Sequence, residues 1–196
     1  MRLADAHMSA KNKDAAAQSL RKALEVKSDL VDAQGGLIML SLDAKKYPEA
    51  IAIARTVQKQ RPKEAIGYIL EGDVNAAQKN WDSAIAAYRV GLKDAPSSEL
   101  AVKAHAALNG SNKAADAEKF AVTWIKDHPA DAAFQFYLGD YAIARKDYAA
   151  AEKAIASMDE VVGKDAYLEF LAGTACALGD DLDGALRHAA LGRKLD

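Results

Sequence analysis

One alanine returns along this chain of 196 residues at an almost constant interval. The recurring positions are Ala16, Ala50, Ala84, Ala117, Ala151 and Ala185, which lie 34, 34, 33, 34 and 34 residues apart. A period of this length is typical of stacked supersecondary units, because each unit can bury its apolar face only against its neighbours. The interval therefore predicts a solenoid, with function on a surface and not in a catalytic pocket.

The composition favours an all-α chain. Hydrophobic residues make up 51% and charged residues 28%, with only 12 glycines and 4 prolines. The net charge of −2 gives no basic footprint, so we expect no nucleic-acid partner. No stretch approaches the roughly 20 apolar residues of a membrane span, and no export signal is visible at the start. We therefore expect no direct membrane insertion.

Each repeat reads as two helices joined by a turn. In residues 31–62, two helical patterns are separated by AKKYPE. Pro48 suits the first turn of the second helix, and Pro62 ends it, because the residue before a proline avoids helical dihedrals. In the next unit the break is QKNWDS, where Asn80 or Asp82 can cap the second helix.

Alignment on the recurring alanine gives columns with physical meaning. Mostly small residues lie twelve positions before it: Ala4, Ile38, Gly72, His105, Gly139 and Gly173. Bulky residues lie three before it, at Tyr47, Trp81, Tyr148 and Leu182. A small residue on the first helix facing a small residue on the second lets the two backbones pack closely. We expect this packing to offset the cost of each helical glycine, about 1 kcal/mol relative to alanine.

Prolines also return in register, since Pro62, Pro96 and Pro129 each follow the alanine by twelve residues. This combination of columns resembles the tetratricopeptide repeat. The resemblance implies a right-handed α-solenoid of about six stacked helix-turn-helix units in a single array over residues 1–196. We assign a partial first unit to residues 1–30 and a last unit to residues 166–196. The four full units between them are 31–64, 65–97, 98–131 and 132–165.

Two details depart from that pattern. Glu71 stands where the repeat usually has a large apolar residue, and we expect Leu70 to rotate in to replace it. No polar helix covers either end of the array, although solenoids normally need such caps. We therefore expect uncapped ends, a piece of a longer protein, and end-to-end self-association.

No catalytic constellation is visible, and we expect no enzyme, cofactor or metal. The histidines are scattered over four repeats, at His7, His105, His128 and His188. His105 falls in the small-residue column and is interpreted as a structural histidine, while His128 is expected at a helix C-terminus. No H-E-x-x-H, C-x-x-C, G-x-S-x-G or phosphate-binding loop occurs.

The remaining chemical candidates have structural interpretations. Asp180, Asp181 and Asp183 lack the length and distal Glu of a calcium loop, and carboxylates suit the first turn of a helix. The single cysteine, Cys176, is interpreted as a small core residue. Trp81 and Trp124 are expected to pack.

With no catalytic motif visible, the resemblance implies that function depends on a binding groove. In this repeat the first helices line the concave side, and a fixed set of positions points inward. The candidate partner-binding residues on that set are Met39, Asp73, Lys103, Phe136, Tyr137, Asp140, Tyr167, Phe170 and Thr174. The four aromatics among them either bind a partner or pack against the neighbouring first helix. Gly35 and Gly36 permit close approach of a ligand backbone or, in our preferred interpretation, of the adjacent helix.

The groove lacks the clamp by which the best-known tetratricopeptide proteins hold a C-terminal carboxylate. That clamp needs Lys, Asn and Arg at two positions of successive first helices, and this chain has Asp32, Gly36, Ile66, Leu70, Glu99, Lys103, Ala133, Tyr137, Tyr167 and Leu171 there. One lysine cannot supply the bidentate grip. A co-chaperone role is therefore not expected.

The local sequence of residues 13–153 resembles a bacterial envelope family. The resemblance is carried by stretches such as GYILEGDVNAAQKNWDSAIAAYRVGLKDAP and TWIKDHPADAAFQFYLGDYAIARKDYAAAEK. These are the repeat-rich lipoproteins that accompany PEP-CTERM/exosortase sorting and exopolysaccharide loci. The resemblance implies a periplasmic or membrane-tethered scaffold that binds a protein or peptide.

Three hypotheses stay open. The first is a non-catalytic scaffold in the bacterial envelope, acting in polysaccharide export or surface-protein sorting. The second is a cytoplasmic adaptor or regulator that uses the same groove. The third is the repeat region of a larger enzyme, such as a glycosyltransferase.

Overall fold

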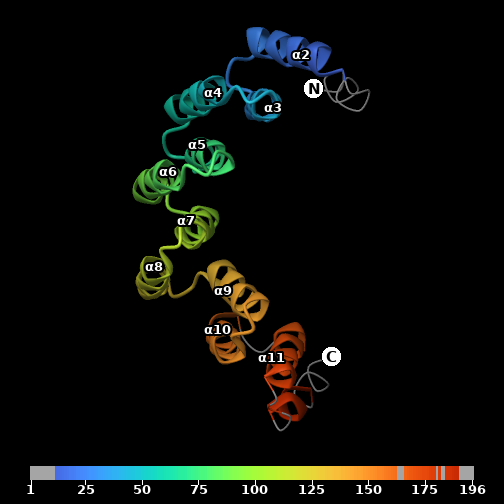
Figure 1. The fold of residues 1–196 in the computed structure, drawn as a ribbon, viewed down its shortest axis with the longest axis vertical. Coiled ribbons are helices and arrows are strands. Elements are labelled where there is room, and N and C mark those ends of the chain that lie inside the picture. The colour runs from blue at the N-terminus through green and yellow to red at the C-terminus, as the bar shows by residue number, and fades with distance from the viewer. Residues whose placement is uncertain (1–11, 163–165, 180, 182–183, 190–196) are drawn as a thin grey trace. The chain divides into compact units, whose positions relative to one another are not determined.

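The computed structural model describes residues 12–162, 166–179, 181 and 184–189, and for 159–162 and 166–171 it describes the backbone alone. In this part of the chain all regular secondary structure is helical (Figure 1). The helices are α2 (Lys13–Val26), α3 (Val31–Asp43), α4 (Tyr47–Gln60), α5 (Ile66–Ala77), α6 (Trp81–Asp94), α7 (Ser98–Gly110), α8 (Ala114–Asp127), α9 (Ala132–Ala144), α10 (Tyr148–Val162) and α11 (Ala166–Leu178), and residues 184–189 are also helical.

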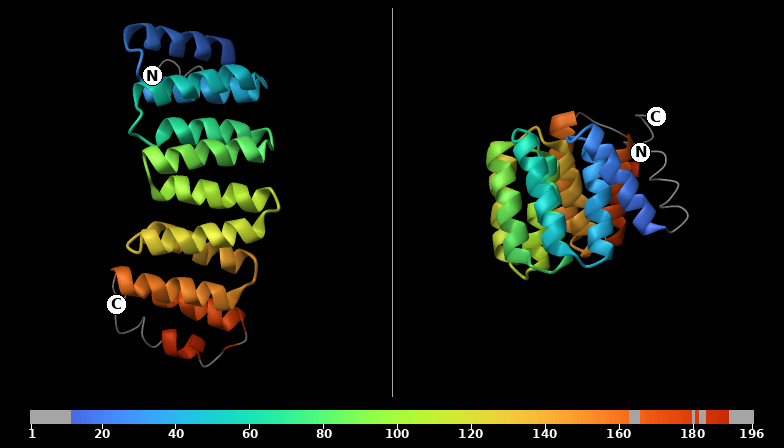
Figure 2. Two further views of the ribbon diagram at one scale, coloured as in Figure 1. Left: turned by 90° about the vertical axis from the view of Figure 1, so that its left-hand side faces the viewer. Right: turned by 90° about the horizontal axis from the view of Figure 1, so that it is seen from above.

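The chain forms two compact units, unit 1 (Met1–Ala117) and unit 2 (Glu118–Asp196). In unit 1 each helix from α2 to α7 packs against the next, so that helical hairpins are stacked side by side (Figure 2). In unit 2, α10 packs against both α9 and α11. The predicted α-solenoid of helix-turn-helix units is confirmed, with α3 and α4, α5 and α6, α7 and α8, and α9 and α10 falling within the four predicted full units. Handedness and end capping stay predictions.

The recurring alanines are the centre of each hairpin. Ala16, Ala50, Ala84 and Ala151 are 0% exposed and Ala117 is 1% exposed. Ala185, on the helical stretch 184–189, is partly buried. A methyl group fits where two helices of one hairpin and the next hairpin meet, which is why the position returns once per unit.

The turn inside each hairpin is a repeated backbone structure. Lys45, Lys79, Asn112 and Lys146 have φ between 57° and 61°, and each lies five residues before a recurring alanine. The following residue donates its N–H to a carbonyl five residues earlier, as in Lys46 N to Ser41 O at 2.7 Å. This is the Schellman arrangement, in which one left-handed residue ends a helix and satisfies its last carbonyls.

The glycine column works differently from our expectation. Gly72 on α5 faces the ring of Tyr88 on α6, not a small residue, and a Cβ atom at Gly72 would overlap that ring. Tyr88 is 2% exposed, so the glycine makes room for a buried aromatic ring. At Gly139 the nearest side-chain atom is 3.7 Å from an added Cβ, an ordinary contact. Small residues in this column therefore compensate for the size of the residue opposite, which at Ile38 is Ala54.

Helix ends follow the sequence signals with one exception. Pro48 lies in the first turn of α4, and α4 ends at Gln60, two residues before Pro62. Asn80 occupies the N-cap position of α6, but its side chain makes no capping hydrogen bond. Ser97 and Asp131 do cap α7 and α9, accepting from Leu100 N and Phe134 N. Asp181 precedes the helical stretch 184–189 and likewise accepts from Gly184 N at 2.9 Å, the hydrogen bond of an N-cap residue, while Asp180 and Asp183 lie outside the described residues.

Among the described residues, no helix combines the length and hydropathy that a bilayer crossing requires.

Candidate partner-binding surface

The first helices of unit 1 form one layer, because α3 packs against α5 and α5 packs against α7. We call α3, α5 and α7 the first-helix layer. Met39 on α3 and Asp73 on α5 occupy the same repeat position, 34 residues apart. Met39 is 54% exposed, one of the most exposed large apolar side chains in the described chain.

Asp73 and Lys103 connect two helices of this layer. Lys103 Nζ on α7 lies 2.7 Å from Asp73 Oδ2, and both side chains are more than a third exposed. The Tyr88 hydroxyl of α6 donates to the other oxygen, Asp73 Oδ1, at 2.6 Å. Burial raises the pKa of Tyr88, and the hydrogen bond to Asp73 raises it further, so the hydroxyl stays a proton donor. The carboxylate is thus held in one orientation with an accessible edge.

The two glycines of α3 differ in their surroundings. An added Cβ at Gly36 would lie 2.9 Å from Leu20 Cδ1 of α2, so this glycine accommodates the adjacent helix. At Gly35 nothing lies within 4 Å of such an atom. Gly35 therefore leaves open space on α3 instead of making a contact.

In unit 2 the candidate residues have different surroundings. Phe136 packs against Ile155 and Met158 of α10 and Ala172 of α11, which is the packing alternative. Asp140 is exposed on α9, and Thr174 is partly buried on α11. The backbones of Tyr167 and Phe170 lie on α11, but their side chains lie outside the described residues.

Tyr137 belongs to a series of rings on α8 and α9. Its ring centroid lies 5.9 Å from that of Phe134 and 6.1 Å from that of Tyr141. Burial, and secondarily Tyr141, raises the pKa of Tyr137 to about 12. Trp124, 7% exposed, donates Nε1 to Asp131 Oδ2 at 2.8 Å and stacks on His128 at a centroid distance of 3.8 Å. Trp124 is thus a packing residue, and His128 directly follows the end of α8, both as expected.

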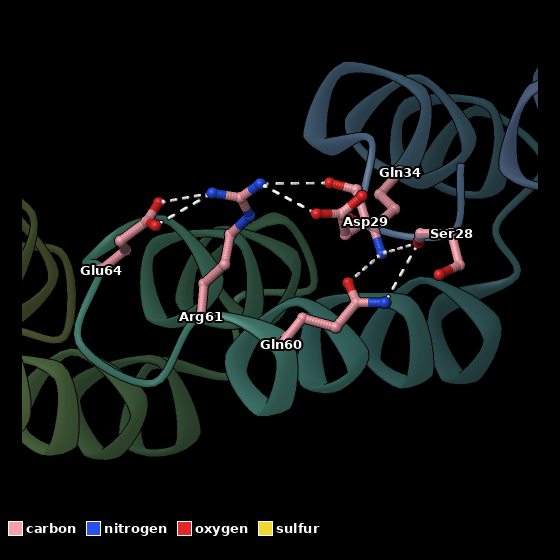
Figure 3. Close-up of polar contacts among 6 residues, drawn as sticks. All are labelled: Ser28, Asp29, Gln34, Gln60, Arg61 and Glu64. Atoms are coloured by element: carbon pink, nitrogen blue, oxygen red, sulfur yellow. Dashed lines mark hydrogen bonds and ion pairs between the residues drawn. The ribbon is translucent and has the colours of Figure 1, made fainter.

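The loops of unit 1 are joined by polar contacts that are structural (Figure 3). Gln34 Nε2 donates to Gln60 Oε1 at 2.7 Å, and both amides reach Ser28 O. One repeat later the Tyr68 hydroxyl takes the place of Gln34, 3.2 Å from Asp94 Oδ2. Because equivalent residues make equivalent bonds in successive units, this network holds hairpins together and is not a ligand site.

A hollow of about 430 Å³ opens on the other layer of unit 1, between the second helices α4 and α6 with α5 as its floor. We call it the outer hollow. Its lining includes Glu71, whose carboxylate accepts from Arg55 Nε at 2.8 Å and Gln58 Nε2 at 2.6 Å. Leu70 packs against the core of Ile38, Ala50, Ala54 and Val74, as expected from the sequence. Glu71 is thus displaced outward into a polar contact between helices.

Sequence reasoning did not bring Glu152, Cys176 and His188 together. In unit 2 one ligand-type atom of each lies within 4.8 Å of the others, and His188 Nε2 is 3.8 Å from Glu152 Oε1. Cys176 is 3% exposed, as expected for a core residue. Burial raises the pKa of its thiol, and the Glu152 carboxylate, which accepts its hydrogen bond, raises it further. The only signal in the sequence is their register relative to the recurring alanine.

Comparison with known proteins identifies the repeat. The tetratricopeptide repeat family matches residues 36–99 and 102–161. No curated protein matches the sequence. A Pseudomonas aeruginosa PilF structure is similar with a TM-score of 0.56 and 17% identity, over 99% of this chain and 89% of that one. A structure of MamA from residue 41 to its end, from Desulfovibrio magneticus RS-1, gives a TM-score of 0.50 at 15% identity, over 84% of this chain and 93% of that one. At these identities the likeness shows the fold alone.

Proposed function

The chain belongs to the tetratricopeptide repeat family, commonly protein-interaction scaffolds, and from this premise we propose that it is a non-catalytic scaffold that holds a segment of a partner protein against its first-helix layer. The observation that carries the proposal is the oriented Asp73 carboxylate on α5, with the exposed Met39 at the equivalent position of α3. A methionine side chain adapts its shape to different apolar partners.

The Asp73–Lys103 pair is a poor stabilising device, since pairs this exposed contribute about 0–1 kcal/mol. As a recognition device it is well suited. Tyr88 fixes the carboxylate before a partner arrives, which reduces the entropy lost on binding. A partner N–H or ammonium group can bind Asp73, while Lys103 turns to a partner carboxylate or carbonyl. The expected ligand is therefore a polypeptide segment with an apolar side chain next to a polar or charged group.

The test is a phage-displayed random peptide library selected on the whole chain. Met39→Glu and Lys103→Ala should each weaken the selected peptides by about tenfold or more, equal to at least 1.4 kcal/mol. Val90→Glu is the matched control, because Val90 is 50% exposed but lies on α6 and lines the outer hollow. Peptides that bind all variants alike, or that are lost only with Val90→Glu, would refute binding at the first-helix layer.

In unit 2 the same role is proposed for Asp140, with Tyr137 as its aromatic neighbour on α9. Asp140→Lys changes an exposed charge and should weaken binding of any selected peptide that contacts α9. Its control is Val122→Lys on α8, since Val122 is 64% exposed. Equal effects of the two substitutions would exclude a specific role for Asp140.

We further propose a setting in the bacterial envelope, in exopolysaccharide export or PEP-CTERM protein sorting. The support is the resemblance of residues 13–153 to lipoproteins of those systems. Sequencing the complete open reading frame and fractionating the source cells tests it. A signal with a lipid-anchor motif and recovery with the envelope fit the proposal. A cytoplasmic location favours the adaptor hypothesis, and an attached catalytic domain favours the repeat region of an enzyme.

A further inference from the structure

The cluster of Glu152, Cys176 and His188 joins three helical segments of unit 2. Glu152 comes from α10, Cys176 from α11, and His188 from residues 184–189. A carboxylate, a thiol and an imidazole, the three ligand types that Zn²⁺ takes in proteins, lie within 4.8 Å of one another. Around a tetrahedral zinc ion such atoms stand roughly 3.3–3.7 Å apart, so rotations that move them by about 1 Å bring all three to bonding distance.

The repeat itself shows that the fold does not require these residues. Glu152 lies one residue after the recurring Ala151. Cys176 lies nine residues before the next recurring alanine, Ala185, and His188 lies three residues after Ala185. In unit 1 the same positions hold Ile51, Asn75 and Ala87, which all line the outer hollow. The remaining copies in the sequence are Ala17, Ser41 and Ile53; Ile85, Leu108 and Phe120; and Glu118, Ala142 and Ala154. Only the last copy combines three metal-binding residue types.

Space and charge around the thiol also suit a cation. Gly184 is buried beside Cys176, and a Cβ atom there would lie 3.0 Å from Sγ. The Asp181 carboxylate lies even closer to that point than Sγ does, so the glycine leaves room for both the carboxylate and the sulfur. The carboxylates of Glu152 and Asp181 both act on Cys176, and Arg187 opposes them with one positive charge. The local balance is negative, so a divalent cation is attracted and a bare thiolate is not stabilised.

We propose that Glu152, Cys176 and His188 bind one Zn²⁺ ion, with a fourth coordination position left for water. Binding replaces the thiol proton, which now bonds to Glu152, and releases it to solvent as the Cys176–zinc bond forms. The ion ties residues 184–189 to α10 and α11. The bound ion would thus stabilise the packing of these three helical segments in unit 2.

The experiment uses the whole chain after treatment with a chelator, titrated with zinc chloride against a chromogenic chelator. One zinc ion per chain is expected. Cys176→Ser and His188→Gln should each weaken binding by at least about tenfold, the lower end of what even indirect changes at zinc sites cause. Zinc should raise the thermal midpoint of the wild-type chain and not of either variant.

Glu152→Gln has a matched control in Glu118→Gln, since Glu118 is exposed at the same repeat position one unit earlier. Glu152→Gln should weaken zinc binding, and Glu118→Gln should leave it unchanged. With Co²⁺ as the probe, the wild-type chain should show a thiolate-to-metal charge-transfer band that Cys176→Ser abolishes. If the wild-type chain shows no such band, or if Cys176→Ser binds zinc as tightly as wild type, the site does not exist. The wild-type cobalt spectrum decides the matter even where a variant fails to fold.

Discussion

Replacing Gly72 by alanine tests how the hairpin α5–α6 is packed. In a helix interior the change by itself stabilises by about 1 kcal/mol. Here the new methyl group would overlap the Tyr88 ring, which is 2% exposed and has no room to swing away. Such overpacking typically costs about 1–3 kcal/mol. A shift of the ring also strains the 2.6 Å hydrogen bond to Asp73, and a bond to a charged acceptor contributes about 1.5–3 kcal/mol.

The sum predicts that Gly72→Ala lowers the free energy of unfolding by about 1.5–5 kcal/mol. Gly35→Ala is the matched control, because Gly35 lies on α3 with nothing within 4 Å of an added Cβ. That substitution should instead stabilise by up to about 1 kcal/mol. The assay is urea denaturation of the whole chain followed by far-ultraviolet circular dichroism, with midpoints compared at unchanged slope.

A second background separates crowding from other causes. Tyr88→Ala removes the ring and introduces the residue that two other units have at this repeat position, Ala54 and Ala121. In that variant Gly72→Ala should become neutral or stabilising. The two substitutions should therefore show a coupling energy of at least about 1.5 kcal/mol. If Gly72→Ala stabilises as Gly35→Ala does, or is equally harmful with and without the Tyr88 ring, the packing argument is wrong.

Two further predictions concern the turn and the buried histidine. Lys79 has φ 59°, so Lys79→Gly should stabilise by about 0.5–1 kcal/mol and Lys79→Val should destabilise, as read from urea midpoints; the reverse order would contradict the left-handed turn. Burial lowers the pKa of His105 from 6.5 to about 4, so the unfolded chain binds the extra proton between these values. The wild-type chain should thus lose about 3 kcal/mol of stability as the pH falls from 6.5 to 4, with the full stability present above pH 6.5. His105→Ile, which places the residue found at Ile38 in the same column, should remove that part of the pH dependence, and equal pH profiles for the two chains would show that His105 does not cause it.

The sequence by itself determined the repeat, because a hairpin must bury a small residue at the same place in every unit. Ala50 and Ala84 are accordingly 0% exposed, and Pro48 and Pro62 bracket α4 as the chemistry of proline requires. These are local constraints or constraints between neighbouring helices, so one alignment of the chain on itself reveals them. The surface candidates Met39, Asp73 and Lys103 were predicted from the sequence as well, because the family resemblance indicates which repeat positions face the groove.

Tertiary structure decided which side chain meets which. Only packing in three dimensions shows that Gly72 makes room for Tyr88 and that Phe136 packs against the core of unit 2. Glu152, Cys176 and His188 come from three helical segments, and their register relative to the recurring alanine does not by itself bring their side chains together. Their meeting depends on how one hairpin stacks on the next, since that stacking fixes which faces of separate helices converge.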